Sequence, residues 1–160
     1  MQDVRVDAGG TTDWEAVYRA EAPGLWRSLV LQTGSPEVAA DAVAEAFAQG
    51  IARGDAIRTP GAWVWRTAFV IARAEAGRLR AAPRDVQERA AVGLESVMEL
   101  LDDLRTLSPM QRSAIVLHYF AGYSVAETAA IVGSTRSAVG VHLFRARRKL
   151  RDRWESDHER

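Results

Sequence analysis

Positively charged side chains gather in two stretches of the sequence, and the chemistry they offer is the binding of a polyanion. Residues 136–153 hold seven basic residues against one acid, Asp152, and residues 65–84 hold five arginines against one acid, Glu75. The 21 basic and 21 acidic residues of the whole chain cancel. This segregation, rather than the net charge, predicts contact with nucleic acid at two places. Taken alone, either stretch could equally be a solvated helix surface.

Two carboxylates and three histidines are the other residues that could do chemistry. Asp41 and Glu45 stand one helical turn apart, a spacing that could serve general acid and base catalysis. No metal-binding set accompanies them, the three histidines are scattered, and the chain has no cysteine. A solvated or partner-facing acidic edge is the better interpretation. The sequence therefore predicts no catalytic residue, no metal ligand and no cofactor, and we expect a protein that is not an enzyme.

The elements that position these residues are predicted to be helices throughout. Strand-like alternation persists nowhere, and Ala, Leu, Arg and Glu dominate. N-cap signals stand at Thr12, Ser35, Thr59, Ser108 and Ser124, and the middle three are each followed by proline at the first helical position. The predicted helices cover residues 13–32, 36–52, 60–80, 94–106, 109–121, 125–132 and 136–153.

The fold class is therefore all-α, and a break in the apolar pattern divides it. Residues 81–93 contain Pro83 and mixed charges without an apolar stripe. We expect two small helical domains, 12–80 and 94–153, joined by this linker. No apolar run approaches the roughly 20 residues of a membrane span, and the first residues lack a signal-peptide stretch. A cytoplasmic protein without membrane insertion is expected.

The pattern near the C-terminus predicts a helix-turn-helix. A short helix with small residues, Ser124–Val132, is followed at once by Gly133, which can adopt the left-handed conformation of a tight turn. Thr135 then caps a helix whose buried stripe is expected at Val139, Leu143, Ala146 and Leu150. The opposite side of that helix could lie in a DNA major groove. A plain helical hairpin with a basic tail is the simpler alternative.

The same segment resembles a known family. From Leu104 to Leu150 the sequence is similar to region four of sigma factors, especially the small extracytoplasmic-function (ECF) class, in which this region binds the promoter −35 element. The matching residues are Leu104, Leu107, Pro109, Gln111, Arg112, Leu117, Tyr119, Gly122, Ser124, Glu127, Ala129, Gly133, Val139, Leu143, Arg145, Ala146 and Arg147.

The resemblance implies roles for residues of this segment. The residues expected to face the −35 DNA are Ser124, Thr135, Arg136, Ser137, Ala138, Gly140 and Val141, with Arg145 and Arg148 on phosphates. Gly140 and His142 replace the more common Lys and Arg, so an atypical −35 specificity is expected. The β flap of the polymerase is expected to bind an apolar surface near Leu100, Leu104 and Leu117.

The N-terminal part resembles sigma region two. Asp41, Glu45, Ala46 and Phe47 match a helix that binds the β′ clamp of core polymerase in that family, so Asp41, Glu45 and Phe47 are implied polymerase contacts. Aromatic residues interleaved with arginine in residues 60–80 can stack unpaired bases, and the family uses this helix at the −10 element. The implied −10 contacts are Trp65, Arg66, Phe69, Arg73 and Arg78. Trp63 is expected in the core.

These patterns together predict a bacterial transcription initiation factor. Its expected partners are core RNA polymerase, through the β′ clamp and β flap, and promoter DNA, and the resemblance admits an anti-sigma protein as a third. Two other classes stay open. One is a helix-turn-helix regulator of the LuxR type that does not dock on polymerase. The other is a sigma-like interaction module that has lost promoter melting, because Phe69 and Val70 stand where the family carries polar residues.

Overall fold

The structure is a computed structural model that describes residues 11–79 and 95–158, and every regular element in those residues is helical. The first group of elements is α1 (Trp14–Thr33), α2 (Pro36–Arg53), a 3₁₀ turn η1 (Gly54–Ala56) and α3 (Pro60–Leu79). The second group is α4 (Glu95–Arg105), α5 (Pro109–Ile115), a π-helical turn η2 (Val116–Phe120), α6 (Val125–Val132) and α7 (Arg136–His158). The all-α fold class is confirmed. The linker expected at residues 81–93 lies outside the described residues.

Local side chains set the starts of α2, α5 and α6 at Ser35, Ser108 and Ser124, as the sequence predicts. The Ser108 and Ser124 hydroxyls each accept a hydrogen bond from the amide three residues on, and Gln111 and Glu127 complete two capping boxes. The prediction of Thr12 as the first N-cap is wrong. Asp13 caps α1 by accepting from the Ala16 amide at 3.0 Å, and the Thr12 amide, which Glu15 was expected to bind, donates instead to the Asp55 carboxylate at 2.7 Å.

Two helix boundaries differ from the prediction for tertiary reasons. The expected helix 109–121 changes to a π-helical turn after Ile115, so that Tyr123 can donate its amide to the Leu117 carbonyl and begin the next turn. The last helix continues to His158 instead of ending near 153. Its final turns are held by contacts with α4 that no local pattern contains.

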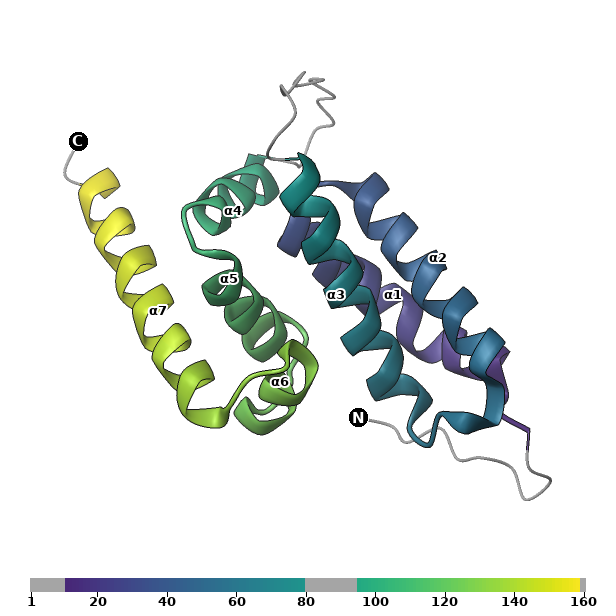
Figure 1. The fold of residues 1–160 in the computed structure, drawn as a ribbon. Helices are drawn as coiled ribbons and strands as arrows, with labels where there is room; N and C mark the ends of the chain where they lie inside the picture. The colour runs from purple at the N-terminus through teal and green to yellow at the C-terminus, as the bar shows by residue number, and fades with distance from the viewer. Residues whose placement is uncertain (1–10, 80–94, 159–160) are drawn as a thin grey trace.

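The two helix groups lie side by side, with α1 and α3 facing α5, η2 and α6 (Figure 1). Helix α7 lies on the far side of the second group, away from α1, α2 and α3. Side chains such as Leu25 and Phe69 from the first group and Leu117 and Val139 from the second belong to one continuous hydrophobic cluster. The division into two domains therefore stays a prediction, while the contact between the two groups is a finding.

Replacing glycine with alanine in α2 and in α7 is expected to change the stability of the protein in opposite directions. A Cβ on Gly50 would lie 2.5 Å from Cη2 of Trp14, whereas a Cβ on Gly140 would meet nothing within 4 Å. Alanine is normally favoured over glycine inside a helix by about 1 kcal/mol. We therefore expect Gly50→Ala to destabilise the protein and Gly140→Ala to stabilise it by about 1 kcal/mol, measured by urea unfolding. Stabilisation by both variants would contradict the packing of Trp14 against α2.

Candidate nucleic-acid interface

The predicted helix-turn-helix is present in α6 and α7. Gly133 joins the two helices in the left-handed conformation, with φ 68°, and the Ser134 amide donates to the Ala129 carbonyl at 2.9 Å. The Thr135 hydroxyl accepts from the Ala138 amide at 3.1 Å and so caps α7. Because a side chain on Gly133 would be strained at this φ, the crossing of the two helices depends on a glycine here.

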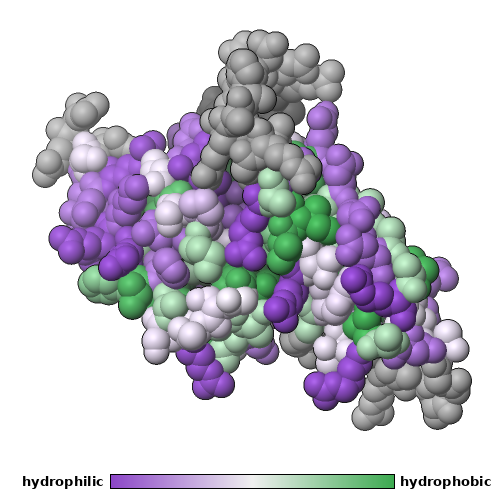
Figure 2. All heavy atoms as spheres, viewed as in Figure 1, coloured by the Kyte–Doolittle hydropathy of each residue, from purple (hydrophilic) through white to green (hydrophobic). Residues whose placement is uncertain are grey.

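Helix α7 has one buried side and one free side. Val139, Leu143 and Ala146 are at most 3% exposed and pack inward, as the sequence predicts. On the other side, the residues expected at the −35 element are exposed except for Ala138, which is half-buried; the exposed ones are Thr135, Arg136, Ser137, Gly140, Val141, Arg145 and Arg148, with Ser124 at the start of α6. Hydrophilic residues cover most of the α7 surface in Figure 2. The N-terminal turns of α7 therefore present an exposed side that could enter a groove of DNA.

The basic residues of α7 differ in how the protein engages them. Among the described residues, Arg145 and Arg148 form no hydrogen bond or ion pair with the protein, whereas Arg147 donates to the Tyr119 hydroxyl at 2.7 Å. Free guanidinium groups can reach phosphate oxygens without breaking a contact. Sequence reasoning missed Phe144, which directly precedes Arg145 and is 60% exposed. Its position opposite the Val139–Leu143–Ala146 stripe was the signal that could have found it.

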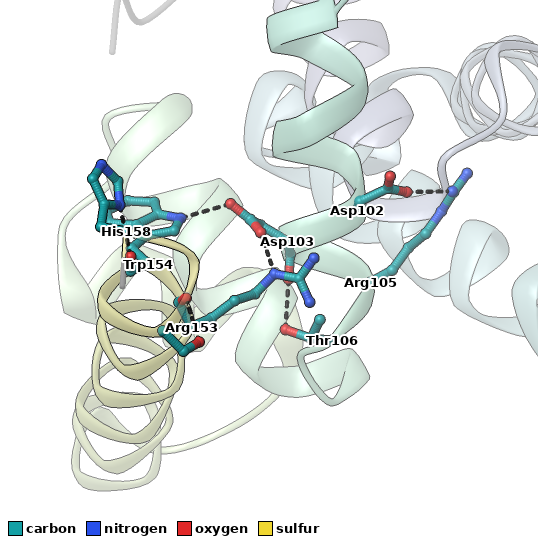
Figure 3. A network of polar contacts seen from close by, with 8 residues as sticks. Asp102, Asp103, Arg105, Thr106, Arg153, Trp154 and His158 are labelled. Carbon is teal, nitrogen blue, oxygen red and sulfur yellow. Dashed lines mark hydrogen bonds and ion pairs between the residues drawn. The ribbon is translucent and has the colours of Figure 1, made fainter. Parts of the chain in front are cut away.

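The C-terminal turns of α7 are held to α4 by one carboxylate (Figure 3). Asp103 accepts from Nε of Arg153 at 2.6 Å and from Nε1 of Trp154 at 2.7 Å. One turn earlier, the Lys149 ammonium donates to the Thr106 carbonyl. These contacts fix the direction of α7 relative to the other helices of the second group.

Replacing Asp103 with alanine is expected to loosen the end of α7 without unfolding the protein. Both hydrogen bonds are lost at once, and each contributes about 1 kcal/mol. Hydrogen exchange should speed up at residues 151–158 by about tenfold and stay unchanged at residues 136–146. Asp102→Ala is the matched control, because Asp102 pairs with Arg105 on its own helix. Equal protection in the two variants would show that Asp103 does not hold the tail.

The residues expected at the −10 element do not form one exposed surface. Trp65 is 4% and Phe69 is 0% exposed. Trp65 donates from Nε1 to the Glu21 carboxylate at 2.7 Å, and its ring meets the ring of Tyr123 edge-on at 5.0 Å. In this conformation neither Trp65 nor Phe69 faces solvent, while Arg66 is exposed. The side chain of Arg78 lies outside the described residues, so its expected −10 contact stays a prediction.

Arg73 is half-buried and partly engaged. Its Nε donates to the Phe69 carbonyl at 3.3 Å, and its Nη1 lies 3.4 Å from Sδ of Met110. Burial lowers the pKa of Arg73 from its ordinary value, because desolvation disfavours the charged guanidinium. Trp63, expected in the core, is half-buried and packs against the edge of the core, with the guanidinium of Arg53 5.1 Å from the centroid of its ring.

The residues implied to contact the polymerase are likewise partly exposed and partly buried. Asp41 and Glu45 are exposed on α2, but Phe47 is 5% exposed and packs edge-on against Trp14 and Tyr18, with ring centroids 6.4 and 4.9 Å away. Phe47 thus anchors α2 on α1 and places the two acids outward. The β-flap surface expected near Leu100, Leu104 and Leu117 is not a surface. Leu104 on α4 and Leu117 in η2 are fully buried in the hydrophobic core, and Leu100 is half-buried against it.

A groove that sequence reasoning missed runs between α1 and α2. Its volume is about 530 Å³, and its lining residues are Tyr18, Arg19, Ala22, Pro23, Trp26, Ala40, Val43 and Ala44. The exposed rings of Tyr18 and Trp26, two turns apart on α1, were the available signal. Across the described residues, none of the helices is both long and apolar enough to span a bilayer.

The fold and the exposed side of α7 define an all-helical protein with a helix-turn-helix. Several known proteins are similar to it. The family profile of sigma-70 region 4 matches residues 98–150. The RNA polymerase sigma-E factor of Streptomyces avermitilis is 30% identical over 159 residues, which cover 92% of this chain and 88% of that protein. The chain belongs to the ECF sigma factor family.

Other relatives agree on the family but are longer. The ECF sigma factor BldN of Streptomyces coelicolor is 28% identical over 91% of this chain and 62% of its own length. The ECF sigma factor SigD of Mycobacterium tuberculosis is 37% identical over 48% of this chain and 41% of its own length. The chain thus spans less than two thirds of either relative.

Two solved structures share the fold. The sigma factor RpoE of Bartonella quintana, in complex with the anti-sigma factor NepR, has a TM-score of 0.73 at 22% identity, over 91% of this chain and 98% of that chain. CnrH, in complex with the cytosolic domain of CnrY, has a TM-score of 0.73 at 22% identity, over 90% of this chain and 88% of that one.

Proposed function

We propose that the chain is a dissociable initiation subunit that directs core RNA polymerase to promoters. The observation that carries the proposal is the exposed side of α7. The residues expected at the −35 element lie there, after the turn at Gly133 that joins α6 to α7. It acts without catalysis of its own, in the cytoplasm. Membership of the ECF family supports the polymerase as its partner.

The second helix group is proposed to bind the −35 element. The early turns of α7, from Thr135 to Val141, meet base edges in the major groove, while Arg145 and Arg148 reach phosphates. Phe144 adds an apolar contact of the kind that a thymine methyl group accepts. Because Gly140 carries no side chain, the backbone there can approach the DNA closely.

The first helix group is proposed to bind the polymerase and the −10 element. Asp41 and Glu45 offer an acidic edge on α2 to the β′ clamp, and the groove beside them offers Tyr18 and Trp26. Val97 and Met98, exposed on α4, are our candidates for the β flap in place of the buried leucines. Arg66 and Arg73 are proposed to hold the −10 strand. An anti-sigma protein is proposed as a regulatory partner, since the structural neighbour RpoE is bound to the anti-sigma factor NepR.

Run-off transcription with purified core polymerase on genomic fragments tests the proposal, with start sites read by sequencing. The chain should produce discrete start sites that core polymerase alone does not, and it should co-purify with core polymerase. The matched negative control is Asp41→Lys/Glu45→Lys, which reverses the acidic edge and leaves α7 intact. Sequence-specific DNA binding without co-purification would identify a conventional regulator. Co-purification without transcripts would identify a module that no longer melts promoters.

A further inference from the structure

The exposed side of α7 carries two apolar side chains in the middle of a polar and basic surface. Val141 is 46% and Phe144 is 60% exposed, and because they stand three residues apart they are neighbours on one side of the helix. The same helical spacing places Ser137 one turn before Val141 and Arg148 one turn after Phe144, and both of these are exposed as well. These four residues form a stripe opposite the buried stripe of α7. Its two middle members are apolar.

The protein leaves both apolar side chains open to a ligand. Gly140, one turn before Phe144, adds no side chain that could cover the ring, and a Cβ built on this glycine would meet nothing within 4 Å. Trp154, also a large apolar residue exposed on α7, is different, because its Nε1 donates to the Asp103 carboxylate at 2.7 Å. The exposure of Val141 and Phe144 is therefore not explained by a contact within the chain.

The charges around the apolar pair favour DNA as the ligand. Residues 136–151 contain no acid, and the first one along α7 is Asp152. Arg145 and Arg148, which flank the pair, form no hydrogen bond or ion pair with the described part of the protein. In a major groove, rows of phosphates border a floor of base edges. Apolar side chains between unpaired guanidinium groups complement such a groove.

The base edges differ in what they offer to an apolar side chain. Thymine presents its 5-methyl group in the major groove, whereas cytosine presents an amino donor that an apolar side chain leaves without a partner. Three residues of helix rise by about 4.5 Å, which is close to the roughly 3.4 Å between successive base pairs. Val141 and Phe144 can therefore each meet one of two neighbouring bases.

We propose that Val141 and Phe144 read the 5-methyl groups of two neighbouring pyrimidines in the −35 element. This inference rests on the proposed function and adds the chemistry that the site recognises. Thymine carries the methyl group, and 5-methylcytosine carries it at the same place in the groove. A −35 element with cytosine at these positions should therefore bind weakly until the cytosines are methylated.

Deleting the methyl groups from the DNA tests the inference. Duplexes that bind the full chain are selected from a randomised pool, and the tightest one is resynthesised with deoxyuridine in place of each thymine in turn. At two neighbouring positions the loss of the methyl should weaken binding about fourfold each, and elsewhere by less than about twofold, measured by fluorescence anisotropy. Equal affinity for the thymine and uracil duplexes would overturn the inference.

A double variant assigns the effect to the two side chains. Val141→Ser/Phe144→Ser should bind the thymine and uracil duplexes equally, because it has lost the apolar surface on which the methyl groups pack. Ile51→Ser is the matched control, since Ile51 is 59% exposed on α2, and it should keep the full difference between the duplexes. A difference that persists in the double variant would contradict the assignment.

Adding methyl groups is the reciprocal measurement. Cytosine in place of both thymines should weaken binding of the unchanged chain about tenfold or more, and 5-methylcytosine should recover about fourfold per methyl group. The double serine variant should show no recovery. Absence of recovery in the unchanged chain would refute the reading of methyl groups.

These measurements separate the inference from the proposed function, because selection from the pool needs no polymerase. A chain that shows the methyl effect but gives no transcripts with core polymerase would refute the initiation function and leave the inference standing. Discrete start sites together with duplexes that are insensitive to the methyl groups would refute the inference alone. A double serine variant that keeps its affinity for the duplex and no longer co-purifies with core polymerase would show that the apolar pair binds a protein instead.

Discussion

Alanine at both Arg145 and Arg148 is expected to weaken binding to every promoter fragment by about tenfold or more, and to flatten its salt dependence by about two units in the slope of log K against log salt. The physical reason is that neither guanidinium is engaged by the described protein, so each is available to displace counterions from the DNA. The loss should be the same for matched and mismatched sequences, because phosphate contacts carry no base information. Fluorescence anisotropy at several salt concentrations measures both quantities.

The control for this double variant removes the same charge elsewhere. Arg19→Ala/Arg27→Ala deletes two exposed arginines on α1, far along the chain from the reader helix. It should change the salt slope little, because a distant charge is screened beyond roughly 10 Å at 0.1 M salt. An Arg145/Arg148 variant with the wild-type slope would show that α7 does not lie along the DNA backbone.

Alanine at Phe69 is expected to reduce the free energy of unfolding by about 3–5 kcal/mol, the range for deleting a buried aromatic ring. Phe69 is fully buried, and its ring stacks on Trp65 at a centroid distance of 6.2 Å. A small domain has only about 5–15 kcal/mol of stability in total, so this one substitution should remove a large share of it. Urea unfolding followed by circular dichroism measures the change.

A variant at the neighbouring residue, Val70, tests whether Phe69 stabilises the core or binds DNA. Val70 is 53% exposed on the same helix, and Val70→Ala should change stability by no more than about 0.5 kcal/mol. If Phe69 were instead a base-stacking residue, Phe69→Ala would unfold like the wild type and lose only binding to the −10 strand. That pattern would contradict the packing of α3 described above.

The parts of the site that follow from local interactions could be predicted from the sequence. The capping boxes at Ser108 and Ser124 and the left-handed turn at Gly133 each depend on residues within a few positions of one another. The α7 stripe of Val139, Leu143 and Ala146 follows from helical periodicity alone. These features are enough to place the −35 residues on a free helix side. The prediction of a capping box at Thr12 is wrong: Asp13 is the cap, and the Thr12 amide binds Asp55, 43 residues away.

The sequence by itself determined that the chain is helical, where most helices begin, and which side of α7 is apolar, because these depend on short-range geometry. Only the tertiary structure decided which aromatic and leucine side chains are covered. Trp65, Phe69 and Phe47 lie on helices with apolar residues on more than one side, and periodicity does not say what packs on each side. The hydrogen bond between Asp103 and Arg153, 50 residues away, could not be predicted from the sequence either. The sequence pattern of a helix shows which of its sides are apolar, whereas burial depends on which other helices the whole chain packs against that helix.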